Sequence, residues 1–244
     1  MRPLTTTELL QVWENGLHQS LTERSLHLLC VACGMQNIQQ AARLSIGTRD
    51  ACLLQLRQWM FGNRLLNMAH CPHCRQQVEW EQPVHTLQVQ NMVWEPLEYA
   101  AEKEGYSIRF RLPQTQDIWQ VQHITEPGEA TLKVLQACIQ EALYQGQPCA
   151  IQHLPGEVAE HIMQRMSEAD PQADITMQLN CPACATQWNA VFDIASFLWT
   201  EIHQWSLRML QEIGTLAKVF SWSEQDIMNM SAQRRRLYLE MALT

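Results

Sequence analysis

Two Cys-Pro-x-Cys pairs constrain the fold of this chain more than any other feature. The pairs are Cys71-Pro72-His73-Cys74 and Cys181-Pro182-Ala183-Cys184, and more than a hundred residues separate them. Each pair places two thiols on a tight turn whose first step is preset by proline. Two such turns brought together supply a tetrahedron of sulfur ligands. The sequence therefore predicts one structural zinc ion per chain, held by Cys71, Cys74, Cys181 and Cys184 in a zinc ribbon that an inserted subdomain splits.

Two other interpretations of these pairs stay open at the level of sequence. In one, the two turns are unrelated to each other; in the other, one pair is a redox dithiol, although the strand-then-helix context of thioredoxin-like pairs is missing. The residue after the second cysteine of a zinc knuckle is usually glycine, because the chain turns left-handed there, and here it is Arg75 or Ala185. A left-handed conformation costs such residues on the order of 1 kcal/mol each. Zinc binding, at roughly 10 to 16 kcal/mol, outweighs that strain.

The remaining cysteines and the nearby histidines are weaker candidates for metal ligands. Cys30 and Cys33 have the spacing of a knuckle and a glycine after it, but they lie in a helical pattern and are interpreted as core residues. His70 and His73 flank the first pair and are alternative ligands, although a histidine in such a place is more often a hydrogen-bonded bystander. Three further cysteines have no partner spacing and are expected to be buried thiols: Cys52, Cys138 and Cys149.

No catalytic constellation is found in the sequence. It has no glycine-rich phosphate loop, nucleophile elbow or His-Glu-x-x-His motif. Acidic residues such as Glu224 and Asp226 are interpreted as helix-start residues. A zinc ion bound by four cysteines has no open position for water or substrate. The sequence therefore predicts a protein that is not an enzyme and has no small-molecule substrate.

Charge and composition bear on compartment and partners. The formal net charge of −8 disfavours binding to nucleic acid. The first residues contain no apolar core of signal-peptide length, and no stretch has the roughly 18 apolar residues of a membrane span. An odd number of cysteines without a secretion signal favours thiols over disulfides. We therefore expect a cytoplasmic protein that does not bind a membrane.

Helical periodicity dominates both ends of the chain. Apolar residues of the first helix fall on one face: Leu9, Leu10, Val12, Trp13 and Leu17. A capping box at Ser20–Glu23 begins a second helix that Gly34 ends, and Thr48 is expected to cap a third that Gly62 closes. These patterns predict that the residues before Cys71 form a helical block.

The longest periodic segment runs from Ile194 to Phe220, across about seven turns. Four of its residues are expected to face inward: Phe197, Trp205, Met209 and Ile213. Ser221–Glu224 has the form of a capping box that begins a short helix with Ile227, and Ser231 can cap a last helix with Leu237, Tyr238 and Met241.

The middle of the chain mixes alternating and helical patterns. Strands are expected around Val78 and Trp80, as a hairpin on either side of Glu104-Gly105, and at 175–179 before Cys181. The alternation of the hairpin begins at Leu97 and ends at Leu112. Helices are expected from Thr115, over a stripe from Leu132 through Ile139 to Leu143, and over 157–168.

The predicted fold class is therefore α+β, mainly α, with helical bundle elements, a split zinc-ribbon-like β element and an inserted α/β subdomain. The expected organisation follows the chain in five segments: an N-terminal helical region (1–70), a first zinc knuckle and strand (71–96), an inserted hairpin and helices (97–174), a second knuckle with flanking strands (175–193), and a long helix with a helical hairpin (194–244).

An ordered series after the second knuckle carries a resemblance to a known family. It runs through Phe192-Asp193-Ile194, Phe197-Leu198-Trp199, Leu216-Ala217, Ser221-Trp222-Ser223-Glu224, Ile227-Met228 and Arg234-Arg235-Arg236-Leu237-Tyr238-Leu239. The chain resembles the T-even-like baseplate hub assembly chaperones of contractile phage tails and related contractile injection systems. Members share a helical start, a Cys-Pro-x-Cys pair on each side of a variable middle, and closing Trp-Ser-Glu and Arg-Arg-x-x-Tyr-Leu series. Arg75 and Ala185 depart from the usual knuckle of the family.

The resemblance implies a non-enzymatic factor that helps to assemble the baseplate hub of a contractile tail, or that stays in it as a minor component. Its partners would be baseplate, hub or spike proteins. Most of the C-terminal apolar residues are expected to pack inside the protein, and Arg234–Arg236 to form a solvated cationic turn.

Two other function classes remain as alternatives. A split zinc ribbon followed by short helices with three arginines has some likeness to a regulatory helix-turn-helix protein that binds nucleic acid, although the acidic net charge weighs against it. A thiol oxidoreductase would need one cysteine pair that cycles between thiol and disulfide without a metal.

Overall fold

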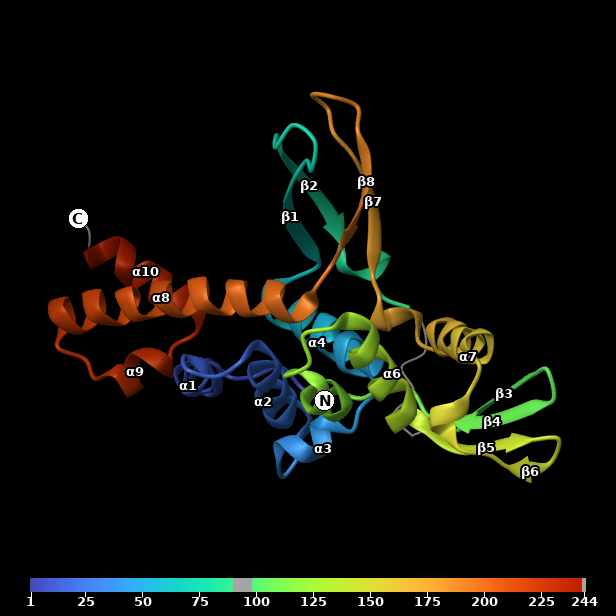
Figure 1. Ribbon diagram of the computed structural model, residues 1–244. Coiled ribbons are helices and arrows are strands. Elements are labelled where there is room, and N and C mark those ends of the chain that lie inside the picture. Colours follow the sequence, from blue (N-terminus) through green and yellow to red (C-terminus); the bar gives the residue numbers. More distant parts are fainter. Residues whose placement is uncertain (90–97, 243–244) are drawn as a thin grey trace. The chain divides into compact units, whose positions relative to one another are not determined.

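The protein is described by a computed structural model over residues 1–89 and 98–242 (Figure 1). The described residues form two compact units: Met1–Gly34 with Ala195–Thr244 make the first, and Met35–Ile194 make the second. Helices predominate, and the strands lie in separate antiparallel groups. The predicted class, α+β and mainly α, is confirmed. Leu97, the first residue of the expected hairpin pattern, lies outside the described residues.

The first unit is built from helices of the two ends of the chain. These are α1 (Thr6–Gly16), α2 (Leu21–Cys33), α8 (Ile194–Phe220, apart from its first residue), α9 (Glu224–Met228) and α10 (Ala232–Ala242). Local caps explain where α2 begins and ends, as predicted. The Ser20 side chain accepts from Glu23 N–H and the Glu23 carboxylate accepts from Ser20 N–H, while Gly34 ends the helix with φ of 65°.

Helix α1 packs on α8 through Trp199. A Cβ atom at Gly16 would come within 2.4 Å of the Trp199 ring, so the absence of a side chain allows this approach. The Arg24 guanidinium lies 4.6 Å from the centre of the same ring. Trp13 Nε1 donates to His203 Nδ1 at 3.0 Å. Leu17, expected on the buried face of α1, is exposed because it lies beyond the last turn.

The buried stripe of α8 differs in part from the predicted one. Met209 and Ile213 are buried as expected, whereas Phe197 and Trp205 are only half-buried. The fully buried positions instead include Leu198, Ile202, Ser206 and Leu216. The stripe is therefore rotated around the helix by about one position relative to the prediction.

The end of α8 and the short helix after it have different caps from those predicted. Ser221 ends α8 with φ of 56°, and Ser223, not Ser221, caps α9 in a box with Asp226. Ser221 cannot act as the N-cap because its backbone is left-handed, whereas an N-cap residue is extended. Ser231 accepts from Arg234 N–H at 3.2 Å and begins α10, as predicted.

Helix α10 presents a different face to the interior from the one expected. Leu237 and Met241 are exposed, and the buried residue is Arg235. Its guanidinium lies 3.6 Å from a Glu212 carboxylate oxygen and donates to Met230 O at 2.7 Å. The expectation that all three arginines are solvated is therefore wrong for Arg235, since the pair with Glu212 compensates its burial. Next to it, the rings of Phe220, Trp222 and Tyr238 contact one another.

The second unit contains α3 (Ile38–Ala42), α4 (Ile46–Phe61), α5 (Thr115–Val121), α6 (Pro127–Cys138) and α7 (Gly156–Ala169), with short 3-10 turns at Val84–Thr86, Ile151–His153 and Pro171–Ala173. Helix α4 ends at Gly62 as predicted, but it begins earlier than expected. Ser45, not Thr48, is its N-cap, and the Ser45 hydroxyl accepts from Thr48 N–H at 3.1 Å.

Four strands of this unit form one antiparallel sheet: β3 (Tyr99–Lys103), β4 (Tyr106–Phe110), β5 (Ile139–Tyr144) and β6 (Gln147–Pro148). The predicted turn between β3 and β4 is present, with positive φ at Glu104 and Gly105. The helix predicted through Ile139 and Leu143 is wrong in its second half. It stops at Cys138, and the chain continues as β5, because β4 offers an open edge for pairing.

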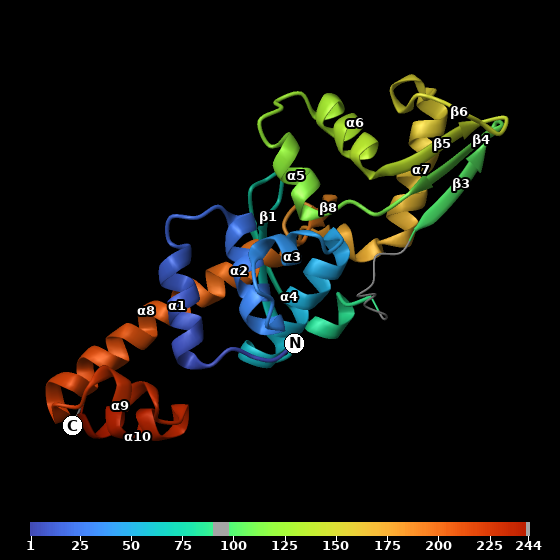
Figure 2. The ribbon, with the colours of Figure 1, turned by 90° about the horizontal axis from the view of Figure 1, so that it is seen from below.

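One face of this sheet carries the main core of the unit. Ala101, Ile108 and Ala142 are neighbours across the strands and are buried under α6 and α7. The opposite face is polar, and Arg109 there lies between Glu98 and Glu141. An antiparallel sheet with one covered face accounts for this alternation. Figure 2 shows α6 and α7 beside the sheet.

The other strands form two separate hairpins: β1 (Arg64–His70) with β2 (Gln77–Pro83), and β7 (Thr176–Asn180) with β8 (Gln187–Val191). The expectation that all residues before Cys71 are helical is wrong for β1. Its pairing partner follows the knuckle, and Leu65 and Asn67 alternate inward in the way of a strand. Within the described residues, no helix has the length and apolar character needed to cross a membrane.

Candidate metal centre

The first cysteine pair lies at the tip of the β1–β2 hairpin. His70 pairs with Gln77 at the end of the ladder, and the turn between them carries both thiols. Cys71 N–H donates to Gln76 O, and Arg75 N–H donates back to Cys71 O, both at 2.9 Å. Arg75 has φ of 60°, the left-handed conformation expected at this position. The backbone therefore turns back on itself and directs both thiols to one side.

The second cysteine pair repeats this geometry at the tip of the β7–β8 hairpin. Cys181 N–H donates to Thr186 O, and Ala185 N–H donates to Cys181 O, again at 2.9 Å. Ala185 has φ of 58°. Two segments far apart in sequence thus adopt the same turn, in which a non-glycine residue takes the strained position.

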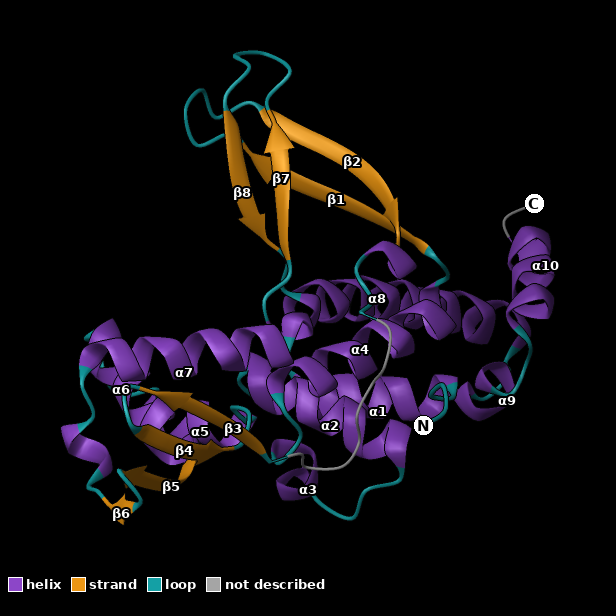
Figure 3. Ribbon diagram, turned by 90° about the vertical axis from the view of Figure 1, so that its right-hand side faces the viewer, coloured by secondary structure: helices purple, strands orange, loops and turns teal. Residues whose placement is uncertain are grey.

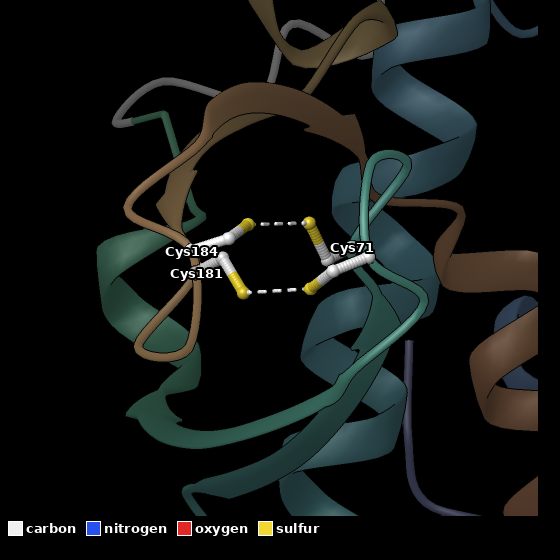
Figure 4. A group of neighbouring side chains, drawn as sticks. Cys71, Cys181 and Cys184 are labelled. Carbon is white, nitrogen blue, oxygen red and sulfur yellow. Dashed lines mark hydrogen bonds between the residues drawn. The ribbon is translucent and has the colours of Figure 1, made fainter.

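The tips of the two hairpins lie side by side (Figure 3), and Figure 4 shows the sulfur atoms of Cys71, Cys181 and Cys184 pointing into the space between them. The sulfur atoms of all four cysteines come together there. Cys71 Sγ lies 3.7 Å from Cys184 Sγ, and Cys74 Sγ lies 3.5 Å from Cys181 Sγ. All four atoms lie within 4.8 Å of one another. A tetrahedral site with Zn–S bonds of about 2.3 Å requires sulfur atoms about 3.8 Å apart. The four cysteines can therefore hold a metal ion without rearrangement of the turns.

The thiols differ in burial and in electrostatic setting. Cys71 and Cys181, the first cysteines of each turn, are buried, whereas Cys74 is exposed and Cys184 is intermediate. Hydrogen bonds with the hydroxyl and backbone of Thr186 lower the pKa of Cys184 to about 6. The pKa of Cys74 rises to about 12, since a lowering backbone hydrogen bond from Gln76 is outweighed by its contacts with the other thiols. A divalent cation favours the thiolate form of every ligand.

Thr186 is a neighbour of the centre that the sequence analysis did not consider. Its hydroxyl lies 3.2 Å from Cys184 Sγ, while Gln76 occupies the corresponding place after the first pair. The only sequence indication was a hydroxyl residue two positions after the second cysteine. Sulfur ligands commonly receive such outer hydrogen bonds, which adjust their charge.

The facing sides of the two hairpins are half-buried along their length. Three of these side chains are neither fully buried nor fully exposed: Trp80 on β2, Leu179 on β7 and Trp188 on β8. Gln82 Nε2 lies 3.1 Å from Met177 Sδ and joins the two hairpins away from the tips. The cysteines thus lie at one end of a small element of two packed hairpins, and few side chains are fully buried between these hairpins.

The weaker ligand candidates are not members of the sulfur cluster found among the described residues. In the described part of the chain, the cluster consists of the four predicted thiols, and neither His70 nor His73 belongs to it. Cys30 and Cys33 lie in α2 of the other unit, where burial raises the pKa of both thiols. Cys52 and Cys138 are buried, as expected, and Cys149 is half-buried. The structure thus brings together the two Cys-Pro-x-Cys pairs and no third pair.

Comparison with known protein families places this architecture in a phage context. The model of a family described as T4 bacteriophage base plate protein matches residues 6–199. This range contains α1, both cysteine pairs and the sheet between them, and it ends at Trp199, before the closing series from Ser221 to Leu239. No curated protein and no solved structure matches the chain. Because the match covers most of its length, the chain belongs to the T4 bacteriophage base plate protein family.

Proposed function

We propose that this chain is a non-enzymatic assembly factor or minor component of the baseplate hub of a contractile tail or injection system. Membership of the base plate family is the observation that carries the proposal. The chain would act in the cytoplasm, bind hub or spike proteins, and need no small-molecule substrate. It would contribute a binding surface for these proteins on a rigid scaffold, and the metal-bound cysteine centre would supply part of that rigidity.

The resident ion of the centre is proposed to be zinc, one per chain. Four thiolates in a tetrahedron are the ligand set of structural zinc sites, and iron is the main competitor for the same set. With Cys71, Cys74, Cys181 and Cys184 as ligands, the ion has no position for a substrate. Bound zinc would therefore stabilise the fold and would not take part in a reaction.

The C-terminal helices are proposed to contribute to partner binding. Leu237 and Met241 on α10 are exposed, and so are the arginines on either side of Arg235. Apolar residues with flanking cations are typical of the rim and edge of a protein interface. The cations would set the orientation of an acidic partner more than the affinity.

Co-expression tests the proposal directly. The chain should be captured together with a hub or spike protein when it is expressed with hub, spike and wedge proteins of the same gene cluster. The yield of soluble hub with and without the chain separates two roles. An assembly chaperone raises that yield and is absent from finished particles, whereas a minor component remains in them.

Failure to capture any baseplate protein would count against the proposal. Salt-sensitive binding to DNA or RNA, together with that failure, would favour the alternative of a zinc-ribbon protein that regulates through nucleic acid. The structure offers this alternative little support, because Arg235 is buried against Glu212 and only the outer two arginines of the triplet are exposed.

A further inference from the structure

A cavity in the second unit lies away from the cysteines and has no role in the proposed metal centre. It is an open groove with a volume of about 450 Å³, and it is lined by residues of α5, α6 and α7, the start of α4 and the segment after α7. Figure 2 shows α5 next to α6, and α7 along the sheet. The volume lies within the range of about 300 to 1,000 Å³ that is usual for ligand pockets. The cavity is therefore large enough for one or two bulky side chains of another protein.

The walls of this cavity are mainly apolar. Ile118 from α5, Val134 from α6 and Met163 from α7 line it, and none of the three is fully buried. Ile118 is 42% exposed, although it is a large apolar residue. Methionine adapts its shape to different apolar partners. These side chains would lose contact with water if an apolar group entered between them.

One end of the cavity is acidic. Asp170 and Asp174, at the end of α7 and shortly after it, contribute to the lining. Their hydrogen-bond partners are neutral: Asp170 accepts from Gly47 N–H at 3.0 Å and from the Ser45 side chain, and Asp174 accepts from the Thr176 hydroxyl at 3.3 Å. Neither carboxylate forms an ion pair with any residue that the structure describes. Burial raises the pKa of Asp170. A cation placed beside a half-buried carboxylate favours its charged form.

We propose that this groove binds a segment of a baseplate protein that inserts an apolar side chain between α5, α6 and α7 and places a lysine or arginine beside Asp170 and Asp174. The inference rests on the proposed function for the identity of the partner. The combination of an apolar wall with unpaired carboxylates at one end selects a basic amphipathic segment, and it disfavours an acidic one. A second copy of this chain fits less well, because its formal net charge is −8.

An array of overlapping 15-residue peptides from the hub, spike and wedge proteins of the same gene cluster tests this inference with the full-length, metal-loaded chain. Bound peptides should contain an apolar residue within about one helical turn of a lysine or arginine. Replacement of that basic residue by glutamate should reduce binding, and the effect should shrink as salt is raised.

A pair of tryptophan substitutions on α7 shows whether the groove itself is the binding site. Ser167 is exposed and lines the groove, so Ser167→Trp should fill it and lower peptide affinity at least about tenfold, a loss of about 1.4 kcal/mol. Gln164 is exposed on the same helix but does not line the groove, and Gln164→Trp should leave the affinity unchanged. Asp174→Asn, which keeps the shape of the side chain, should weaken binding several-fold and reduce its salt dependence.

Two results with the peptides would overturn the inference: bound peptides that lack a basic residue, or equal effects of the two tryptophan variants. Tryptamine, which combines an apolar ring with an amine, serves as a small-molecule probe. Binding of tryptamine but of no peptide would also overturn the inference, because it would indicate a small-molecule site. The two proposals can fail separately. If the Ser167→Trp variant captures as much of its baseplate partner as the unmodified chain does, the groove inference is wrong and the proposed function stands. If no baseplate protein is captured by the unmodified chain, the proposed function fails first.

Discussion

Two kinds of β structure stand in the same unit and are held together in different ways. In the four-stranded sheet, α6 and α7 cover one face, and residues on that face such as Ile108 and Phe110 are almost completely buried. The paired hairpins at the cysteine centre bury little: Leu65 and Asn67 are the buried side chains of β1, and no residue of β7 or β8 in the described chain is fully buried. Isolated two-stranded hairpins are marginal in water. Strands without a buried core need another source of stability, and the four thiols are positioned to hold a metal ion that would provide it.

Loss of the proposed zinc ion should have the largest effect on stability, and this effect should be confined to the hairpins. Cys181→Ser removes a buried ligand, and the binding free energy of structural zinc is roughly 10 to 16 kcal/mol. We expect elemental analysis to find less than one zinc per chain and amide hydrogen exchange to rise in β1, β2, β7 and β8. The sheet β3–β6 should keep most of its protection.

Cys30→Ser is the matched control for this prediction, since Cys30 lies outside the sulfur cluster. It should leave the zinc content at one per chain. A well-folded, unmodified chain that contains iron or no metal would contradict the proposed zinc site.

Truncation of a core side chain of the sheet should have the opposite effect: it should destabilise the sheet and leave metal binding unchanged. Phe110 is 1% exposed and stacks on Tyr99, with ring centres 5.8 Å apart. Phe110→Ala should lower the free energy of unfolding by about 3 to 5 kcal/mol. Chemical denaturation would measure this loss, and the molecules that remain folded should still bind one zinc.

Leu132→Ala serves as the control on α6, because Leu132 is 50% exposed. It should change stability by less than about 0.5 kcal/mol, as is usual for surface substitutions. If the two variants behaved alike, the sheet would not depend on its apolar core in the way described.

The next effect concerns an ion pair that fastens α5 and α6 beside the sheet. Arg111 donates to both carboxylate oxygens of Asp117, at 2.6 and 2.8 Å, and also to Ala137 O. Asp117 is 2% exposed, so Asp117→Asn leaves a half-buried cation without its counterion. A loss of about 3 kcal/mol is expected, by thermal or chemical unfolding.

The exposed pair of Arg165 and Glu168 provides the contrast, since both side chains are about half-exposed. Glu168→Gln should cost less than about 1 kcal/mol. A similar loss in both variants would mean that burial does not decide the strength of these pairs.

The smallest effect should come from the strained turns of the cysteine centre. Arg75 and Ala185 have φ values of 60° and 58°, a conformation that glycine adopts without cost. Ala185→Gly should stabilise the folded, zinc-bound chain by up to about 1 kcal/mol, visible as a small rise in melting temperature. Ala183→Gly, in the same turn, should bring no such gain. A destabilised Ala185→Gly would show that the turn is not strained at this position.

Features that arise from contacts between neighbouring residues could be predicted from the sequence. The Cys-Pro-x-Cys turns, the box at Ser20 and Glu23, the end of α2 at Gly34 and the turn at Glu104-Gly105 were all predicted, because caps and tight turns are made within a few residues. The length of α8 also followed from its period, although the buried stripe did not, since several neighbouring rotations of the pattern are almost equally apolar.

Features that depend on residues distant in sequence could not be predicted, because three-dimensional packing sets them. Ile139 and Leu143 fit a helical stripe, yet they form a strand because their backbone pairs with the edge of β4. Similarly, the residues of β1 form a strand because β2 pairs beside them. Arg235 looked solvated in sequence, but Glu212 on another helix compensates its burial. The convergence of the two cysteine turns belongs to the same class. The sequence supplied four ligands and their chemistry, while the pairing of strands across more than a hundred residues brought their sulfur atoms within reach of a single ion.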